Sequence, residues 1–336
     1  PEIIAELVAA VSARGGHVYV KTGSSKIIRS LYRAGSLKSF EVTAEAELAF
    51  MQKMQGYIAI RNYDNAFEYS DVPADKMTAI RKIMRPVTDW RVKKTKWCVL
   101  RWPSSSMAQA ASMSTEAFED FYFRVCTMDY RGMNVAAQTL AELMRKTDKV
   151  RIEGPDGTDL VFSIKGIPVI PCAGTHNIPD GEVFTAPVKT SVNGFIRFNT
   201  PTLYEGKKYE NLALTFENGK IVSATGSDAA GLNAILDTDE GARYVGEFAL
   251  GINPHITDGM CDILFDEKIS GSIHLTPGAC YDDASNGNVS SIHWDLVLIQ
   301  TEKYGGGRLY FDGVLVRENG LFVLDALKPL NPAIER

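Results

Sequence analysis

Apolar residues in the first half of the chain follow two different periodicities. Four stretches have apolar residues at helical spacing and are predicted to be helices: residues 1–14, 25–33, 41–54 and 74–84. Short apolar runs lie between them and predict buried strands: residues 17–20, 57–60 and 97–100. The Gly15-Gly16 pair is typical of a helix end. Strands that alternate with helices of this length favour an α/β fold with a mostly parallel sheet.

The second half of the chain has a different pattern. A helical pattern over residues 113–146, which residues 129–132 divide into two helices, is followed by short strands separated by turn residues. We predict three hairpins: residues 150–154 with 160–164, 212–216 with 221–224, and 311–316 with 321–324. Their turns contain Asp-Gly or Asn-Gly pairs, which favour tight turns between antiparallel strands. One helix, from Ser227 or Asp228 to about Leu236, interrupts this antiparallel region.

The length and the change of pattern together indicate two domains. A chain of 336 residues is too long for one ordinary core. We place the boundary near residue 148, where the strands become antiparallel. The prediction is an N-terminal α/β domain over residues 1–148 with a mostly parallel sheet, and a C-terminal α+β domain over residues 149–336 that is rich in antiparallel strands.

Composition and charge argue against several classes of protein. The net charge of −5 gives a phosphate-bearing partner no overall attraction, so we expect no nucleic-acid partner. No apolar run approaches the roughly 20 residues that span a bilayer, and no signal-peptide pattern opens the chain, so we expect no membrane partner. The five cysteines show no C-x-x-C spacing, which favours a reducing, cytoplasmic location. The chain begins with Pro1 instead of methionine, as expected of a processed or truncated product.

Candidate metal ligands and a tyrosine are concentrated between residues 265 and 295. This stretch contains Glu267, His274, Tyr281, His293 and Asp295, and so two of the five histidines of the chain. Carboxylate oxygens and imidazole nitrogens together suit divalent cations such as Zn²⁺, Co²⁺ or Mn²⁺. His293 and Asp295 are two residues apart in a strand-like run, so both side chains are expected on one face. Taken alone, His274 also fits a hydrogen-bonded core histidine, and Tyr281 a packed aromatic residue.

Two glutamates lie in stretches where a carboxylate is unexpected. Glu182 follows a Pro-Asp-Gly turn at the start of a strand, and Glu247 lies within the apolar run of residues 244–250. A carboxylate is costly to bury unless it is paired with a cation or bound to a metal. Both glutamates are therefore candidate ligands in the same domain.

Several familiar catalytic motifs are absent from the sequence. The chain has no H-E-x-x-H zinc motif, no P-loop and no G-x-G-x-x-G after a strand. The serines at residues 104–106 lack the G-x-S-x-G context of a serine nucleophile. The residues therefore favour a metal centre over nucleotide binding or a serine nucleophile.

Four blocks of the second half resemble one known family. They are NIPDGEVFTAP around Glu182, LDTDEGARYVGEFALG around Glu247, LFDEKISGSIHLTPGACY around Glu267, His274 and Tyr281, and SSIHWD around His293 and Asp295. In this order they resemble the M29 aminopeptidases, the family of the thermophilic aminopeptidase T. The stretch MAQAASMSTEAFEDFYF in the first half also resembles the family, so the resemblance covers nearly the whole chain.

The resemblance implies a two-metal exopeptidase that removes N-terminal residues from short peptides through a metal-activated water. It implies two divalent ions, Zn²⁺, Co²⁺ or Mn²⁺, and six ligands: Glu182, Glu247, Glu267, His274, His293 and Asp295. It also implies that Tyr281 is catalytic and donates a hydrogen bond to the oxyanion. Either Glu182 or Glu247 is expected to transfer the proton, and a homodimer is expected. The spacing between Glu267 and His274 is two residues longer than in some members.

Two alternatives keep the same fold. Ring-cleaving dioxygenases of the dihydroxypyridine dioxygenase type look like relatives of this family and use one Fe(II), for which His274, His293 and Asp295 would be sufficient. The presence of three further glutamates argues against such a site. A non-catalytic scaffold is the second alternative. The number of bound metal ions separates all three: two for the peptidase, one iron for the dioxygenase and none for the scaffold.

Overall fold

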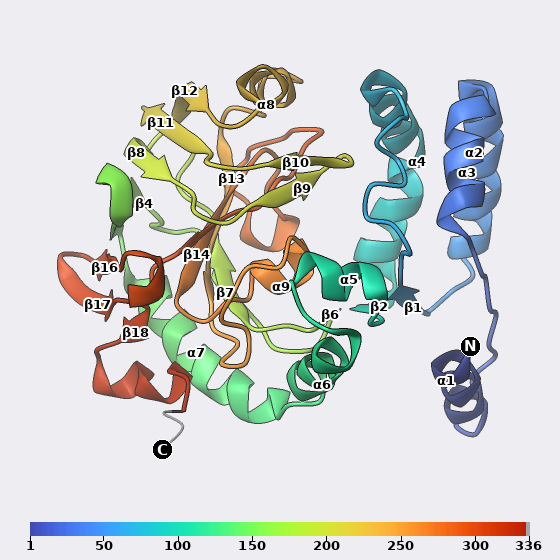
Figure 1. Cartoon of the computed structure of the whole chain (residues 1–336), viewed down its shortest axis with the longest axis horizontal. Helices are drawn as coiled ribbons and strands as arrows, with labels where there is room; N and C mark the ends of the chain where they lie inside the picture. The colour runs from blue at the N-terminus through green and yellow to red at the C-terminus, as the bar shows by residue number, and fades with distance from the viewer. Residues whose placement is uncertain (334–336) are drawn as a thin grey trace.

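Three helices precede the first strand in the computed structural model, which describes residues 1–333 of the chain, and a fourth helix separates the first two strands (Figure 1). The helices are α1 (Glu2–Ser12), α2 (Ser25–Ala34), α3 (Leu37–Met51) and α4 (Ala74–Lys94). Strands β1 (Gly56–Arg61) and β2 (Lys96–Arg101) pair in parallel, and β6 (Asn177–Ile178), from much later in the chain, joins β2 in parallel. The predicted parallel sheet is therefore present, with three strands in the described chain.

The strand predicted at residues 17–20 is wrong. Val18, Tyr19 and Val20 are 41%, 62% and 46% exposed, and the segment is extended without a strand partner in the described chain. Tyr19 instead places its ring 4.5 Å from that of Phe50 on α3. Apolar residues alone do not make a strand, because the backbone also needs a neighbouring strand to pair with.

Three helices connect the parallel sheet to the remainder of the molecule. They are α5 (Ser105–Ala110), α6 (Thr115–Cys126) and α7 (Tyr130–Lys146). Ser104, Ser114 and Asp129 cap their N-termini by accepting backbone N–H groups, which explains where each helix begins. The predicted break at residues 129–132 thus coincides with a helix cap.

The largest sheet has eight strands within the described chain, in the order β12-β11-β8-β4-β3-β16-β17-β18. Their bounds are β3 (Lys149–Glu153), β4 (Asp159–Ser163), β8 (Asn193–Arg197), β11 (Ala213–Glu217), β12 (Lys220–Thr225), β16 (Arg308–Phe311), β17 (Val314–Glu318) and β18 (Leu321–Phe322). All its pairs are antiparallel. The first two predicted hairpins are β3/β4 and β11/β12, and both are confirmed.

The third predicted hairpin needs a correction. Residues 311–316 are not one strand, because Asp312 and Gly313, with φ of 49° and 81°, form a tight turn between β16 and β17. The predicted turn at Asn319 and Gly320 then joins β17 to the short β18. The Asp312-Gly313 pair is a turn signal of the same kind as the Asp-Gly and Asn-Gly pairs from which the hairpins were predicted.

A second antiparallel sheet has five strands in the order β15-β14-β13-β7-β5. Their bounds are β5 (Ile170–Cys172), β7 (Glu182–Thr185), β13 (Val245–Gly251), β14 (Ser272–Pro277) and β15 (Leu296–Ile299). The short helix α9 (Ile263–Asp266) lies between β13 and β14 in the chain, and α8 (Ala229–Leu236) follows β12. A small pair, β9 (Thr202–Tyr204) and β10 (Lys207–Tyr209), completes the strands in Figure 1.

The main core lies between the two antiparallel sheets and includes helix α7. Phe162 of β4 and Phe248 of β13 meet there with ring centroids 4.9 Å apart, and Leu140 of α7 is fully buried in the same cluster. Alternate residues of the five-stranded sheet therefore point into this core. The residues between them point to the opposite face, which a second cluster from α5, α6 and α9 covers in part.

The observed architecture confirms the predicted fold class, with helices around a parallel sheet first and antiparallel sheets afterwards. The domain boundary near residue 148 stays a prediction. Helix α7 precedes that boundary but packs in the later core, and β6 follows it but joins the earlier sheet. Of the helices in residues 1–333, none is both long and apolar enough to cross a membrane.

Candidate metal centre

The five-stranded sheet places three of the predicted ligands on one face. Glu182 on β7, Glu247 on β13 and His274 on β14 occupy the alternate positions that point away from the main core. The antiparallel register pairs Gly251 with Glu182 and Ala249 with His274, so the three side chains come from adjacent strands. Their neighbours in the chain point into the core, which explains why the run around Glu247 is almost entirely apolar.

Loops bring the other three predicted ligands to the same face. Glu267 follows α9, and His293 and Asp295 precede β15. The strand predicted to carry His293 and Asp295 begins only at Leu296, and His293 makes a single isolated bridge with Gly278. That part of the prediction is corrected, yet Nε2 of His293 lies 3.4 Å from Oδ1 of Asp295.

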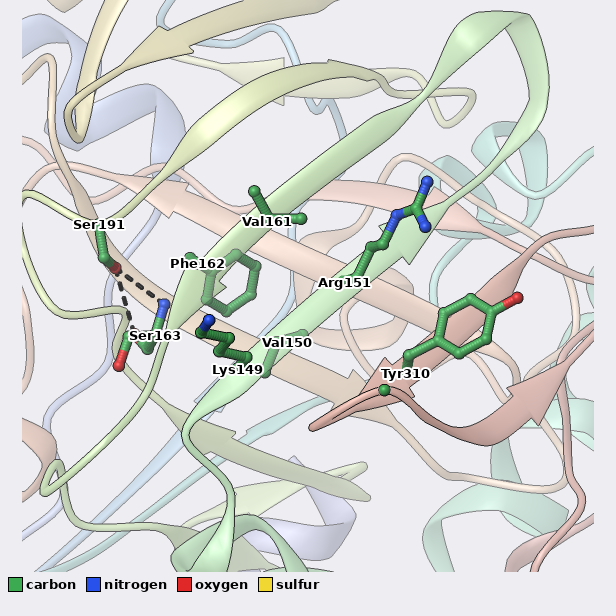
Figure 2. Close-up of a pocket in the computed structure, with 9 residues that line it drawn as sticks. Lys149, Val150, Arg151, Val161, Phe162, Ser163, Ser191 and Tyr310 are labelled. Carbon is green, nitrogen blue, oxygen red and sulfur yellow. Dashed lines mark hydrogen bonds between the residues drawn. The ribbon is translucent and has the colours of Figure 1, made fainter.

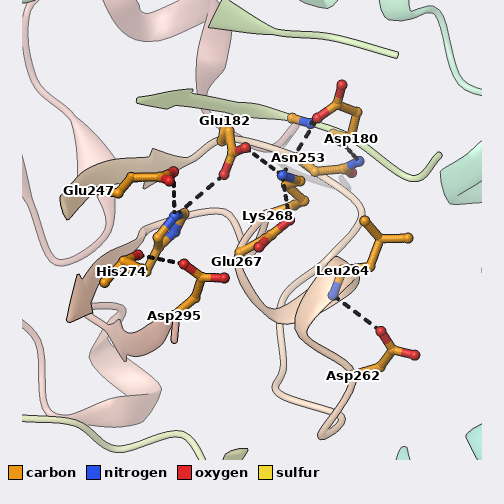
Figure 3. A network of polar contacts seen from close by, with 12 residues as sticks. Asp180, Glu182, Glu247, Asn253, Asp262, Leu264, Glu267, Lys268, His274 and Asp295 are labelled. Carbon is orange, nitrogen blue, oxygen red and sulfur yellow. Dashed lines mark hydrogen bonds and ion pairs between the residues drawn. The ribbon is translucent and has the colours of Figure 1, made fainter. Parts of the chain in front are cut away.

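The six predicted ligands form two adjoining groups of three. Donor atoms of Glu182, Glu267 and His274 lie within 4.8 Å of one another, and so do those of Glu247, His293 and Asp295. The groups meet at His274, whose Nε2 is 3.3 Å from Oε1 of Glu247 and 3.6 Å from Oε2 of Glu182 (Figure 3). The structure therefore brings together every residue that the sequence analysis singled out as a ligand.

The donor atoms of these groups fit divalent cations. Oε2 of Glu182 and Oε2 of Glu247 are buried and have no hydrogen-bond partner among residues 1–333. Buried carboxylate oxygens are normally paired, because their desolvation is costly. Four carboxylates and two imidazoles are also the oxygen and nitrogen donors that Zn²⁺, Co²⁺ and Mn²⁺ accept.

A second layer of contacts orients two of the donors. Nδ1 of His293 lies 2.8 Å from the carbonyl oxygen of Ala279, to which it donates, and this leaves Nε2 free as an acceptor. Thr276 donates its hydroxyl hydrogen to Oδ1 of Asp295. The sequence analysis missed both contacts, since residue spacing says nothing about a backbone carbonyl from another loop.

Lys268 is the most important residue that the sequence analysis missed. Its side chain is fully buried, with Nζ 2.6 Å from Oε1 of Glu182 and 2.7 Å from Oε1 of Glu267 (Figure 3). Asp180 is 3.7 Å from the same nitrogen. The available signal was a lysine directly after a candidate ligand, in a stretch that is otherwise buried.

A third group of donor atoms surrounds this lysine. Cys172, Asp180 and Glu182 also have donor atoms within 4.8 Å of one another. Burial raises the pKa of the Cys172 thiol well above its ordinary value, so the thiolate that a metal needs is disfavoured. The ammonium group of Lys268 already pairs with Asp180 and Glu182. We therefore interpret this group as the ion-pair surroundings of Lys268 and not as a third metal position.

The electrostatics of the cluster follow from burial and mutual charge. Desolvation raises the pKa of Glu247, and it raises that of Glu267 to about 8 in spite of the neighbouring Lys268. For His274 desolvation lowers the pKa, but Glu247 and Glu182 outweigh it and raise the value to about 9. The pKa of Asp295 shifts downward instead, because the charges of His293 and His274 outweigh the effect of desolvation.

Tyr281 lies at the open edge of the cluster. The residue is 47% exposed, and its ring is 4.9 Å from the His293 ring in a T-shaped arrangement and 5.7 Å from that of Phe184. Desolvation of the hydroxyl and the nearby Glu247 raise the pKa of Tyr281 well above its ordinary value. The hydroxyl therefore keeps its proton and can donate a hydrogen bond.

A pocket of about 600 Å³ lies elsewhere, on the eight-stranded sheet (Figure 2). Its lining includes Lys149 and Arg151 of β3, Val161 of β4 and Tyr310 of β16, but no carboxylate, imidazole or thiol. It shares no lining residue with the two groups of donors. Size alone therefore does not locate the chemistry in this molecule.

The sequence matches the family described as thermophilic metalloprotease (M29) over residues 2–321. The chain belongs to the M29 family. This confirms the resemblance drawn from the four sequence blocks.

Several curated relatives of this M29 protein are aminopeptidases by name. Aminopeptidase AmpS of Bacillus subtilis is 37% identical over 142 residues, which are 38% of this chain and 34% of the relative. Aminopeptidase T of Thermus thermophilus is 32% identical over 195 residues, which are 50% of this chain and 47% of the relative. The matched regions thus span between a third and a half of these relatives.

Two solved structures resemble the M29 protein in fold. Wild-type AmpT from Thermus thermophilus has a TM-score of 0.76 at 22% identity and covers 95% of this chain and 90% of its own. A 2,5-dihydroxypyridine dioxygenase from Pseudomonas putida KT2440 has a TM-score of 0.52 at 13% identity, with 87% and 99% covered. Both likenesses concern the fold.

The raised pKa of His274 predicts how the chelator-treated M29 protein responds to pH. An imidazole with a pKa of about 9 when folded, against 6.5 as the reference, stabilises the fold by about 3 kcal/mol below pH 6.5 and loses this contribution by pH 9. Glu267 acts in the same direction between pH 4.5 and about 8, because the unfolded carboxyl ionises first. Urea unfolding at pH 6, 7.5 and 9 should therefore show stability that falls with pH.

Two variants control this measurement. His274→Gln should flatten the decline, whereas His17→Gln, at an exposed position, should leave it unchanged. A decline of the same size in the His274 variant would show that another group is responsible.

Proposed function

We propose that this M29 protein is an aminopeptidase that hydrolyses the N-terminal residue of short peptides with the help of two divalent metal ions, Zn²⁺, Co²⁺ or Mn²⁺. The observation that carries the proposal is the pair of adjoining donor groups on one face of the five-stranded sheet. Each group has three donors, and together they use all six predicted ligands. The names of the curated aminopeptidase relatives support the same activity.

Each group would hold one ion. Glu182, Glu267 and His274 form one position, and Glu247, His293 and Asp295 form the other. Two bound divalent ions would supply an acidified water as nucleophile and would polarise the scissile carbonyl.

Glu247 is the better placed of the two candidate proton carriers. Its two oxygens face His274 at 3.3 Å and His293 at 3.5 Å, so it lies between the two groups. Its Oε2 is buried without a hydrogen-bond partner among the described residues, so this oxygen is available to accept a proton. One oxygen of Glu182 is already paired with Lys268. We therefore assign to Glu247 the transfer of a proton to the leaving amine, and to Glu182 a ligand role.

Tyr281 supplies the hydrogen bond to the oxyanion in this proposal. Its ring lies 4.9 Å from that of His293, and its neutral hydroxyl can donate to a peptide carbonyl bound beside the donor groups. A donor fixed in place before the reaction stabilises charge that develops in the transition state.

The dioxygenase alternative is supported only by the likeness in fold at a TM-score of 0.52. A single iron would need His274, His293 and Asp295. The structure adds Glu182, Glu247 and Glu267 to the same cluster, and a mononuclear site would leave these buried carboxylates without a function. The peptidase accounts for all six residues.

We also propose a cytoplasmic homodimer. The five cysteines are all free, as expected in a reducing compartment. Helix α1 buries no residue against the described chain, and its apolar residues Ile3, Ile4 and Leu7 are partly exposed, which leaves them available for a second copy. Light scattering should give about twice the 36.9 kDa mass of one chain, and a mass of one chain would contradict the dimer.

Metal content and activity together test the main proposal. Elemental analysis should find about two divalent ions per chain, and a panel of amino-acid p-nitroanilides should be hydrolysed in a chelator-sensitive way. The same substrates with an acetylated amino group should resist, because an exopeptidase needs the free amine. One iron per chain without nitroaniline release would favour ring cleavage instead.

The role of Tyr281 can be tested without removing a ligand. Tyr281→Phe should lower turnover by about 10²–10³ while metal content stays unchanged, because one oxyanion donor is lost. Tyr310→Phe is the matched control, since that hydroxyl lies 3.2 Å from Glu153 on the other sheet. Full activity of the Tyr281 variant would remove the tyrosine from the mechanism.

A further inference from the structure

Lys268 makes equivalent contacts with two of the candidate ligands. Nζ contacts one oxygen of Glu182 and one oxygen of Glu267, at 2.6 and 2.7 Å, and in each carboxylate this atom is Oε1. Oε2 of Glu182 is left without a hydrogen-bond partner among the described residues and lies 3.6 Å from His274 Nε2. The lysine thus divides the Glu182 carboxylate into one paired oxygen and one oxygen that faces the cluster.

A fixed anchor holds the lysine itself. Asp180 accepts the backbone N–H groups of Gly174 and Gly181 at 2.7 and 3.0 Å, and its carbonyl oxygen accepts the side-chain amide of Asn253 at 2.7 Å. This buried, hydrogen-bonded carboxylate lies 3.7 Å from Lys268 Nζ. The ammonium group therefore contacts the hydrogen-bonded Asp180 carboxylate as well as the two glutamates (Figure 3).

We propose that Lys268 is a positioning residue that presents Glu182 and Glu267 to the cation of their group, an inference that rests on the two-metal function proposed above. Glu267 is adjacent to Lys268 in the chain, and the ion pair fixes its side chain across the turn after α9. Without the ammonium group both carboxylates could rotate, and cation binding would then have to restrict this rotation. Contacts behind metal ligands typically contribute 10- to 100-fold in metal affinity.

The effect should be confined to one of the two positions. Within residues 1–333, no lysine or arginine forms an ion pair with Glu247 or Asp295, whose charged contacts are with His274 and His293. The second position is oriented instead by Thr276 and by the Ala279 carbonyl. A purely structural lysine would affect folding and both positions alike, so this asymmetry distinguishes positioning from general stabilisation.

Cobalt binding to the chelator-treated full chain tests the inference. Titration calorimetry and the visible absorption of bound Co²⁺ should show two ions for the wild type. Lys268→Met should weaken one of them by about 10- to 100-fold and change its absorption bands. Arg317→Met is the matched control, because Arg317 is a buried cation on β17 of the eight-stranded sheet and donates to Gln300 at 2.9 Å. That variant should lose thermal stability but bind both ions normally.

Double variants assign the effect to one position. In a His293→Ala background the remaining ion is held by Glu182, Glu267 and His274, and adding Lys268→Met should weaken it. In a His274→Ala background the remaining ion is held by Glu247, His293 and Asp295, and the same addition should have no effect. Equal effects in both backgrounds would overturn the positioning role.

Lys268→Arg keeps the test decisive if the methionine variant does not fold. A guanidinium group retains the charge but does not place one nitrogen against both carboxylates as the ammonium group does. Weaker binding of one Co²⁺ by this variant supports the inference, and wild-type binding overturns it.

The same experiments separate this inference from the proposed function. If the wild type binds two ions and hydrolyses aminoacyl nitroanilides, but the Lys268 variants bind normally, only the inference fails. If the variants lose one ion while the wild type hydrolyses none of these substrates, only the proposed function fails.

Discussion

The structure depends on the burial of four carboxylates in one place. Glu182 and Glu247 are only 6% and 3% exposed, and Glu267 and Asp295 lie beside them. Converging negative charges of this kind are unfavourable in a protein interior unless cations are close. Lys268 and the two imidazoles supply part of the compensation within the chain. Bound divalent cations would supply the remainder in the proposed function.

The alternation of side chains along the strands determines where these carboxylates lie. Because successive residues of a strand alternate between faces, Phe248 and Leu250 of β13 enter the main core while Glu247 points to the cluster. The neighbouring strands β7 and β14 behave in the same way. Apolar packing on one face therefore fixes the positions of the candidate ligands on the other, and loss of core packing would disturb the cluster even with all six donor residues unchanged.

The sequence predicted which donor side chains come together better than it predicted the contacts around them. Glu247 stood out because a carboxylate interrupts an apolar run, and such a signal is local. The wrong strand at residues 17–20 came from an apolar pattern whose outcome depends on a neighbouring strand. The missed turn at Asp312 and Gly313 had a local Asp-Gly signal, but it lies within an otherwise strand-like run. The role of Lys268 was not predicted because a lysine is usually exposed. Only the tertiary structure shows that Asp180, which is distant in the sequence, lies next to it.

Charge balance connects the lysine to the number of ions. The charges of Lys268 and Asp180 offset each other, so the four carboxylates of the two donor groups contribute four negative charges when they are ionised. Imidazoles that bind a metal are neutral and add no charge. Two divalent cations would therefore balance the set, whereas one would leave two negative charges buried. A fold shared with a dioxygenase at a TM-score of 0.52 does not decide the reaction. The count of buried carboxylates is thus the physical argument for the two ions of the proposed function, and it does not depend on the family resemblance.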